Sequence, residues 1–153
     1  MSQSPIEIDY NLFINETKTN DVKQSNFMKK KMFVYCSFQK EGYHVFPEAK
    51  TDPVFNTNDF LNVSHLANRH MHYFFFKVWV EVNHSNREIE FIQLRRWLEY
   101  SLGSGTIDVN NKSCEMLAED VINLIHDRYP LAEIRGDVSE EGINGSYLEF
   151  CPL

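Results

Sequence analysis

HMHYFFFKVWVEVN, at residues 70–83, has the composition and alternation of a long β-strand. In its second half Val78, Val80 and Val82 fall on one face, and charged or amphipathic residues alternate with them. A side-chain period of two is the pattern of a strand with one buried face. This stretch therefore predicts the main strand of a β-sheet.

The sequence before this strand predicts a second strand and a long connection. KMFVYCSFQ, at residues 31–39, is dense in β-branched and aromatic residues, and Gly42 marks the turn expected to follow it. The stretch 46–62 contains two prolines and several Asn and Asp residues, which favours a loop. Loops of this length inside a compact domain are often functional.

The sequence after it predicts two helices and then two strands. REIEFIQLRRWLEYSL, at residues 87–102, repeats apolar residues at helical spacing, and a second helix is expected from its N-cap Ser113 to about Tyr129. Strands are expected at 131–139 and 145–150. The predicted class is α+β, an antiparallel four-stranded sheet with two helices packed on one face, in the order ββααββ.

Length and composition indicate one globular domain. The chain has 153 residues, of which 42% are hydrophobic, which suffices for a core but not for two domains of ordinary size. We expect a polar N-terminal arm at residues 1–28 and a single domain at residues 29–153. The net charge of -7 argues against nucleic acid as a partner, because phosphate binding needs a concentrated positive surface.

The cysteines and the hydropathy pattern indicate the compartment. Cys36, Cys114 and Cys151 form no CxxC pair and are odd in number, which favours a reducing environment. We find neither a secretory leader nor an apolar run long enough to cross a bilayer, so no membrane association is expected. A cytoplasmic protein is predicted.

His70 and His72 form an HxH pair at the start of the main strand. Residues two apart on a strand project from the same face, about 7 Å apart along the chain, within reach of one shared ion. His44 follows the preceding strand, and pairing of the two strands would bring it beside the HxH pair. Three histidines are a ligand set for catalytic zinc, which keeps a fourth position open. Solvent-facing or hydrogen-bonded histidines are the alternative.

Further motifs follow the histidines in a fixed order. IEFIQLR at 89–95 enters the first helix, NKSCEMLA at 111–118 begins the second, and Glu140 ends the third predicted strand. With His44 and the HMH at 70–72, this order resembles the family that contains 6-pyruvoyl-tetrahydropterin synthase and 6-carboxytetrahydropterin synthase. The resemblance covers roughly residues 31 to 150, with Met71 where the family usually has glycine.

The resemblance implies the tunnelling fold and a homo-oligomer, a hexamer built as a pair of trimers. It also implies one Zn²⁺ per subunit on the three histidines, a pterin or purine ligand and, through the likeness to 6-carboxytetrahydropterin synthase, a link to queuosine biosynthesis. Glu140 takes the place of the family's ring anchor, because one carboxylate can accept adjacent N–H and NH₂ groups. Glu141 is its reserve, and Ser113 and Glu115 are pocket residues by the same resemblance.

This sequence lacks two catalytic features of the family. The position of its catalytic cysteine holds Leu66, and Cys36 on the first strand is expected to be a core residue. The family's Asp-His relay is reduced to Asp108 with no histidine after it, which leaves the catalytic residues unassigned. His65 is a conceivable base.

Three functions stay open on this basis. The first is a divergent zinc-dependent lyase or hydrolase of the 6-carboxytetrahydropterin synthase type. The second is a protein of the same fold that binds a pterin or guanine nucleotide without altering it. The third is a structural domain with incidental histidines.

Overall fold

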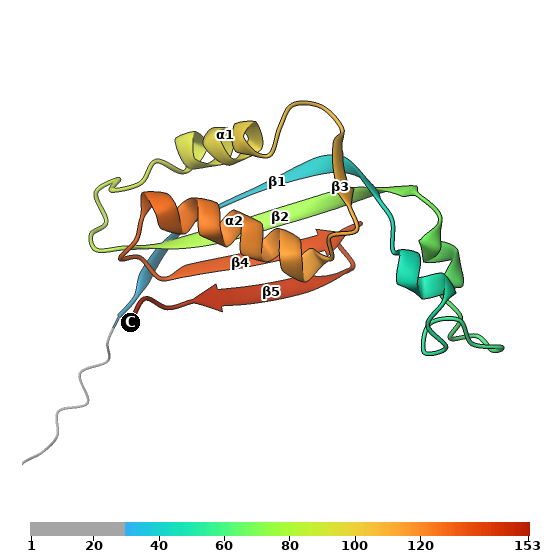
Figure 1. The fold of residues 1–153 in the computed structure, drawn as a ribbon. Helices are drawn as coiled ribbons and strands as arrows, with labels where there is room; N and C mark the ends of the chain where they lie inside the picture. Colours follow the sequence, from blue (N-terminus) through green and yellow to red (C-terminus); the bar gives the residue numbers. More distant parts are fainter. Residues whose placement is uncertain (1–29) are drawn as a thin grey trace, which may run out of the picture.

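The computed structural model of the chain describes residues 30–153, which form one β-sheet and two helices in an α+β arrangement (Figure 1). The predicted arm at 1–28 lies outside the described residues. The elements are β1 (Met32–His44), β2 (His70–Val82), α1 (Phe91–Ser101), β3 (Ile107–Asn110), α2 (Cys114–Arg128), β4 (Ile134–Glu140) and β5 (Asn144–Phe150).

Strands β1 and β2 form the long antiparallel centre of the sheet. They pair over thirteen positions, from Met32 opposite Val82 to His44 opposite His70. The turn predicted at Gly42 is therefore wrong, because this residue lies within β1 opposite His72. A Cβ at Gly42 would stand 2.8 Å from the Phe74 ring, so glycine is what permits the close approach here.

The sheet has five strands in the order β3-β1-β2-β4-β5 and is mixed, which corrects the predicted four-stranded antiparallel sheet. The additional strand, β3, runs parallel to β1 and pairs only with its last residues, Gly42 to His44. It also changes the predicted order ββααββ to ββαβαββ. Four residues, IDVN, are too few for a period-two pattern to be recognised, and pairing with β1 defines this strand.

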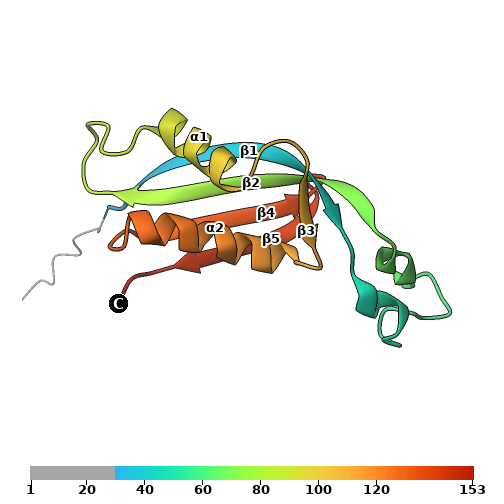
Figure 2. The ribbon, with the colours of Figure 1, turned by 45° about the horizontal axis from the view of Figure 1, so that its top comes forward.

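Both helices cover the same face of the sheet (Figures 1 and 2): α1 packs on β1, and α2 packs on β4 and β5. Alternate strand residues, among them Phe74 and Phe76, point to this face and form the core with Leu98 and Ile125 from the helices. Burial of each such side chain contributes about 1.5–3 kcal/mol. Helix α2 is capped by Ser113 and ends before Tyr129, as predicted. No helix within residues 30–153 has the length and apolar character of a bilayer span.

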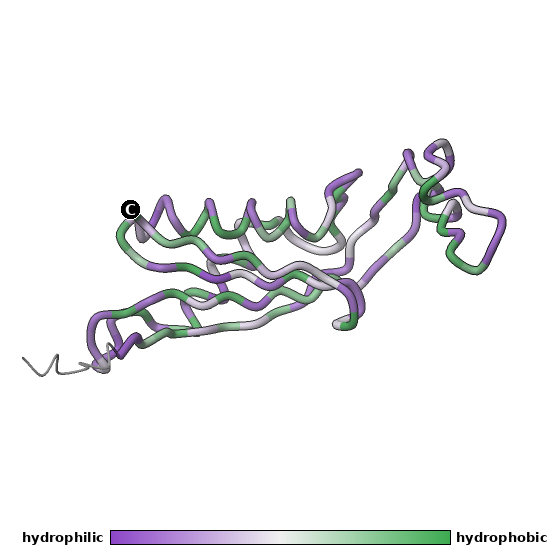
Figure 3. The backbone as a smooth tube through the Cα atoms, turned by 90° about the horizontal axis from the view of Figure 1, so that it is seen from below, coloured by the Kyte–Doolittle hydropathy of each residue, from purple (hydrophilic) through white to green (hydrophobic). Residues whose placement is uncertain are grey.

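The connection between β1 and β2 projects beyond one end of the sheet (Figure 3). It contains two short 3-10 helices, Pro47–Lys50 and Ser64–Ala67, and is held by an edge-to-face contact between Phe46 and Phe55 with ring centroids 5.0 Å apart. Its two ends are His44 and His70. The long predicted loop thus joins the two strands at the position of the histidines.

Candidate metal centre

His44, His70 and His72 share the helix-covered face of the sheet, at the end of the β1–β2 pair. His44 lies directly opposite His70, and His72 follows two residues later, so the strand register gives all three the same direction. Phe74 is the next residue on this face and is fully buried. The core therefore ends at the histidines, which face one another beyond it.

The three imidazole rings converge. Their centroids are 4.7 Å apart for His70 and His72, 5.4 Å for His44 and His70, and 6.0 Å for His44 and His72. One ring nitrogen from each histidine lies within 4.8 Å of the other two. The predicted grouping of these residues around a common point is confirmed.

The nitrogens in this group lack hydrogen-bond partners. His44 Nδ1, His70 Nε2 and His72 Nε2 are buried and have no hydrogen-bond partner within residues 30–153. Buried polar atoms are normally paired, because leaving one unpaired costs about 1–3 kcal/mol. Three such atoms together form a group that could hold one metal ion.

A tetrahedral metal ion fits that position. Zinc binds imidazole nitrogen at about 2.0–2.1 Å. Nitrogens at the corners of a triangle with sides of 4.8 Å, the largest separation in this group, would each lie about 2.8 Å from its centre, so the rings would have to rotate toward one another to reach bonding distance. Three neutral imidazoles are a donor set that suits zinc and other late transition metals.

The hydrogen bond of His70 and the surroundings of His44 both favour metal binding. His70 Nδ1 lies 2.6 Å from the carbonyl oxygen of Asn68, which only accepts, so in the neutral ring Nδ1 carries the proton and Nε2 keeps its lone pair. Burial lowers the pKa of His44, and the nearby His70 and His72 lower it further, while Glu140 acts in the opposite direction. The ring of His44 is thus held neutral, as a metal ligand must be.

The carboxylate of Glu140 stands beside this group. Glu140 ends β4 opposite Phe74, and its two oxygens lie 3.7 Å from His44 Nδ1 and 3.6 Å from His72 Nε2. Its predicted position at the end of a strand is the observed one, and the structure adds that this strand end lies next to the histidines. A carboxylate at this distance would offset part of the charge of a bound cation.

A cavity of about 460 Å³ opens next to His44 and Glu140. Ser113 and Glu115, both predicted as pocket residues, line it at the start of α2. Both residues also take part in the N-terminal cap of that helix. Ser113 Oγ accepts a hydrogen bond from Met116 N at 3.4 Å, and a hydrogen bond with Ser113 lowers the pKa of Glu115. The remaining lining residues are Phe46, Glu48, Asn111, Cys114, Met116, Asn144 and Gly145.

Cys114 is a cavity residue that sequence reasoning did not single out. It is the first residue of α2, within the NKSCEMLA motif, and burial with the nearby Glu140 raises the pKa of its thiol to about 11. The thiol is therefore protonated at neutral pH. Only the packing of α2 against the end of β4 brings it beside Glu140, so local sequence carried no signal for it.

Glu141 does not line this cavity. Its Oε1 lies 3.3 Å from Nδ1 of His72 and accepts a hydrogen bond from the backbone of Tyr73 at 3.0 Å. The structure therefore separates the two neighbouring glutamates, with Glu140 at the unpartnered nitrogens and Glu141 behind one of the rings.

Other predicted residues lie outside the group. His65 is exposed in the projecting connection, and Leu66 uses its carbonyl to accept a hydrogen bond from Phe46 N. Asp108 pairs with Arg69 at 2.9 Å, and that guanidinium lies 3.7 Å from the centroid of the Tyr43 ring. Asp108 is thus engaged with an arginine and not with a histidine.

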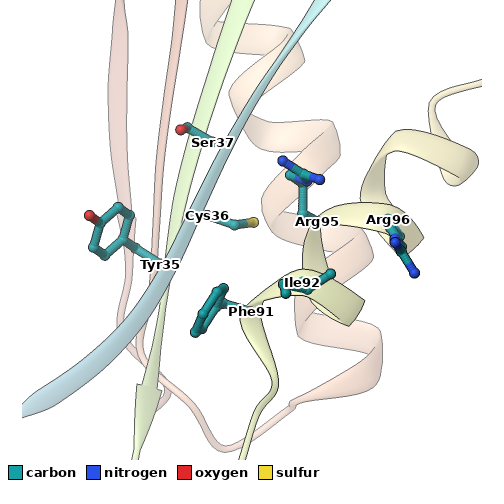
Figure 4. A pocket seen from close by; sticks show the side chains of 7 residues that line it. All are labelled: Tyr35, Cys36, Ser37, Phe91, Ile92, Arg95 and Arg96. Atoms are coloured by element: carbon teal, nitrogen blue, oxygen red, sulfur yellow. The ribbon is translucent and has the colours of Figure 1, made fainter.

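Cys36 is buried among core residues, as predicted, and belongs to a different part of the sheet. It points toward α1 beside another cavity, of about 540 Å³, formed by β1 and the start of that helix (Figure 4). Burial raises the pKa of this thiol to about 11 as well. No histidine lines the second cavity.

Comparison of the chain with protein-family models and with curated protein sequences finds no match. The case for a metal centre therefore rests on the geometry of the histidines.

Proposed function

We propose that this chain is a divergent member of the tunnelling-fold family, a zinc-dependent enzyme of the lyase type that acts on a pterin or purine. The observation that carries the proposal is the convergence of three unpartnered imidazole nitrogens beside a carboxylate that lines a cavity. A fused heterocycle needs such a cavity, with few but well-placed polar groups.

Each group has a role in this proposal. His44, His70 and His72 would hold the ion, and bound zinc would polarise a substrate oxygen and lower the pKa of a hydroxyl. Glu140 would accept the adjacent N–H and NH₂ groups of the ring from the cavity side. Ser113 and Glu115 would contact the substrate at the start of α2.

Of the roles in this proposal, proton transfer has the fewest candidate residues. Leu66 carries no ionisable side chain, Asp108 pairs with Arg69, and His65 is exposed in the projecting connection. Among the groups at the cavity, Glu140 is the one that lies next to the proposed ion. We therefore expect slow turnover.

Incubation with zinc and dihydroneopterin triphosphate tests the synthase activity. The expected result is zinc-dependent loss of the substrate, which stops in the His72→Ala variant and continues in the Glu119→Gln variant on the exposed side of α2. Absence of turnover at any zinc concentration would remove the assignment as a synthase.

The second candidate is a protein of the same fold that binds a pterin or guanine nucleotide without altering it. The engagement of Asp108 by Arg69 favours it, because the remaining half of the relay is not free to work. In this case Glu140→Gln should weaken ligand binding by about 1.5–3 kcal/mol, since it removes a charge-assisted pair. Unchanged affinity for both pterins and guanine nucleotides would refute the anchor role of Glu140.

A homo-oligomer belongs to the same proposal. Strand β5 and most of β1 leave open sheet edges in the described residues, and the sheet face opposite the helices carries exposed aromatics such as Tyr35, Phe75 and Tyr147. Pairing of copies would cover both. A cytoplasmic location is supported by Cys36, Cys114 and Cys151, which are free thiols.

A further inference from the structure

Glu141 contacts the back of the His72 ring. Its Oε1 lies 3.3 Å from His72 Nδ1, whereas the Nε2 atom on the other side of the ring is one of the three unpartnered nitrogens. The ring therefore stands between a carboxylate and the proposed ion. Carboxylate, imidazole and metal in a row is a common arrangement around zinc.

The backbone holds Glu141 in this position. The residue adopts φ 55°, a left-handed conformation that is uncommon for a residue other than glycine, directly after the last pair of the β2–β4 ladder. Its N–H donates to the Tyr73 carbonyl at 2.9 Å, and its Oε1 accepts from Tyr73 N at 3.0 Å. These two bonds to one residue of β2 fix the carboxylate beside His72.

An ionised carboxylate only accepts hydrogen bonds, so the proton on His72 must reside on Nδ1 when the two groups bond. Nε2 then presents its lone pair to the centre of the group. The Asn68 carbonyl imposes the same form on His70, at 2.6 Å from its Nδ1. Two of the three rings thus have a partner that selects the form needed for metal binding.

We propose that Glu141 is a positioning residue of the metal centre: it orients the His72 ring and keeps the ring proton on Nδ1. Glu140, in contrast, lines the substrate cavity. The inference rests on the proposed zinc site and assigns Glu141 a role other than ring binding. Loss of such a partner typically weakens metal binding about 10–100-fold.

Zinc affinity of the full chain, measured by competition with a chelating indicator, tests this role. Glu141→Gln should bind zinc about 10–100-fold more weakly than the wild type, because the amide retains one acceptor but loses the charge. Glu119→Gln is the matched control, since it removes the same charge from an exposed position on α2, and its affinity should equal that of the wild type.

Imidazole nitrogen NMR of the metal-free protein shows which nitrogen of His72 carries the proton, a property that a general loss of stability would not change. The wild type should show His72 protonated at Nδ1, and Glu141→Ala should populate the form protonated at Nε2. Equal zinc affinity of Glu141→Gln and Glu119→Gln, or a wild-type His72 protonated at Nε2, would overturn the role of Glu141 and leave the zinc site standing. Failure of the wild type to bind zinc would overturn both.

Discussion

At the scale of single residues, the histidine group and Glu133 differ in how their buried polar atoms are paired. The histidine group leaves three nitrogens unpaired, whereas Glu133, only 4% exposed, is fully paired at the other end of the sheet. Its carboxylate bonds to Lys31 and accepts from Arg135 Nη2 at 2.7 Å. The first group offers atoms that could bind a metal ion, whereas the second stabilises the fold.

Glu133 should make stability depend on pH at the acid end. The hydrogen bond from Lys31, and then that from Arg135, lowers the pKa of this carboxyl below its ordinary value of 4.5, although burial opposes them. A lowered pKa in the folded state contributes stability that is present above pH 4.5 and is lost as the pH falls through the folded value. Glu133→Gln should therefore lower the free energy of unfolding at pH 7.

Urea unfolding at pH 7 and at several values below pH 4.5 measures this effect. The difference between wild type and Glu133→Gln should shrink as the pH falls. Glu149→Gln is the control, because Glu149 also contacts Arg135, at 3.4 Å, but is half-exposed, so its effect should be small. A difference that does not change with pH would contradict the account.

At the scale of elements, the register of β1 against β2 builds the site. The pairing sets His44 opposite His70 and Gly42 opposite His72, and Phe74 fills the space that Gly42 leaves. The Phe74 ring meets His44 and His72 edge-on, with centroids 6.4 and 5.7 Å away. The core thereby supports two of the proposed ligands directly.

Gly42→Ala should disturb both the core and the site. The new Cβ would stand 2.8 Å from Cε2 of Phe74, which is fully buried and has little room to move. We expect a loss of about 1–3 kcal/mol in stability, typical of overpacking, and weaker zinc binding. Gln39→Ala, exposed on the same strand, is the control for urea unfolding. Equal stability of the two variants would show that Phe74 is not held as described.

The HxH spacing and the Ser113 cap were predictable, because each depends on a short local pattern, whereas the glutamate at the end of β4 was placed by the family resemblance. The strand β3 was not, since IDVN forms a strand only by pairing with β1. The contact of Glu141 with His72 depends on a left-handed backbone after β4, and the position of Cys114 depends on the packing of α2. Such features arise from tertiary structure and leave no periodic signal.

At the scale of the whole molecule, the helices cover one face of the sheet, and no other element within residues 30–153 covers the second face. The helices pack on one side, and the other exposes Tyr35, Tyr73, Phe75 and Tyr147. Assembly of several copies into a barrel would cover this exposed aromatic face and the edge of β5, which is unpaired within the described residues.

Light scattering after size exclusion tests the assembly. A pair of trimers should have a mass of about 109 kDa, six times the 18.1 kDa chain. Replacement of Phe75 by glutamate should reduce this mass, because it would bury a charge in the covered face. A wild-type particle of 18 kDa at micromolar concentration would contradict the proposed assembly.

The central claim is that His44, His70 and His72 hold one metal ion. Elemental analysis of protein purified without added metal tests it most directly, with His70→Ala as the comparison. We predict close to one equivalent of zinc per chain in the wild type and little in the variant. A folded wild type that contains no transition metal, and takes up none when zinc is supplied, would contradict the account.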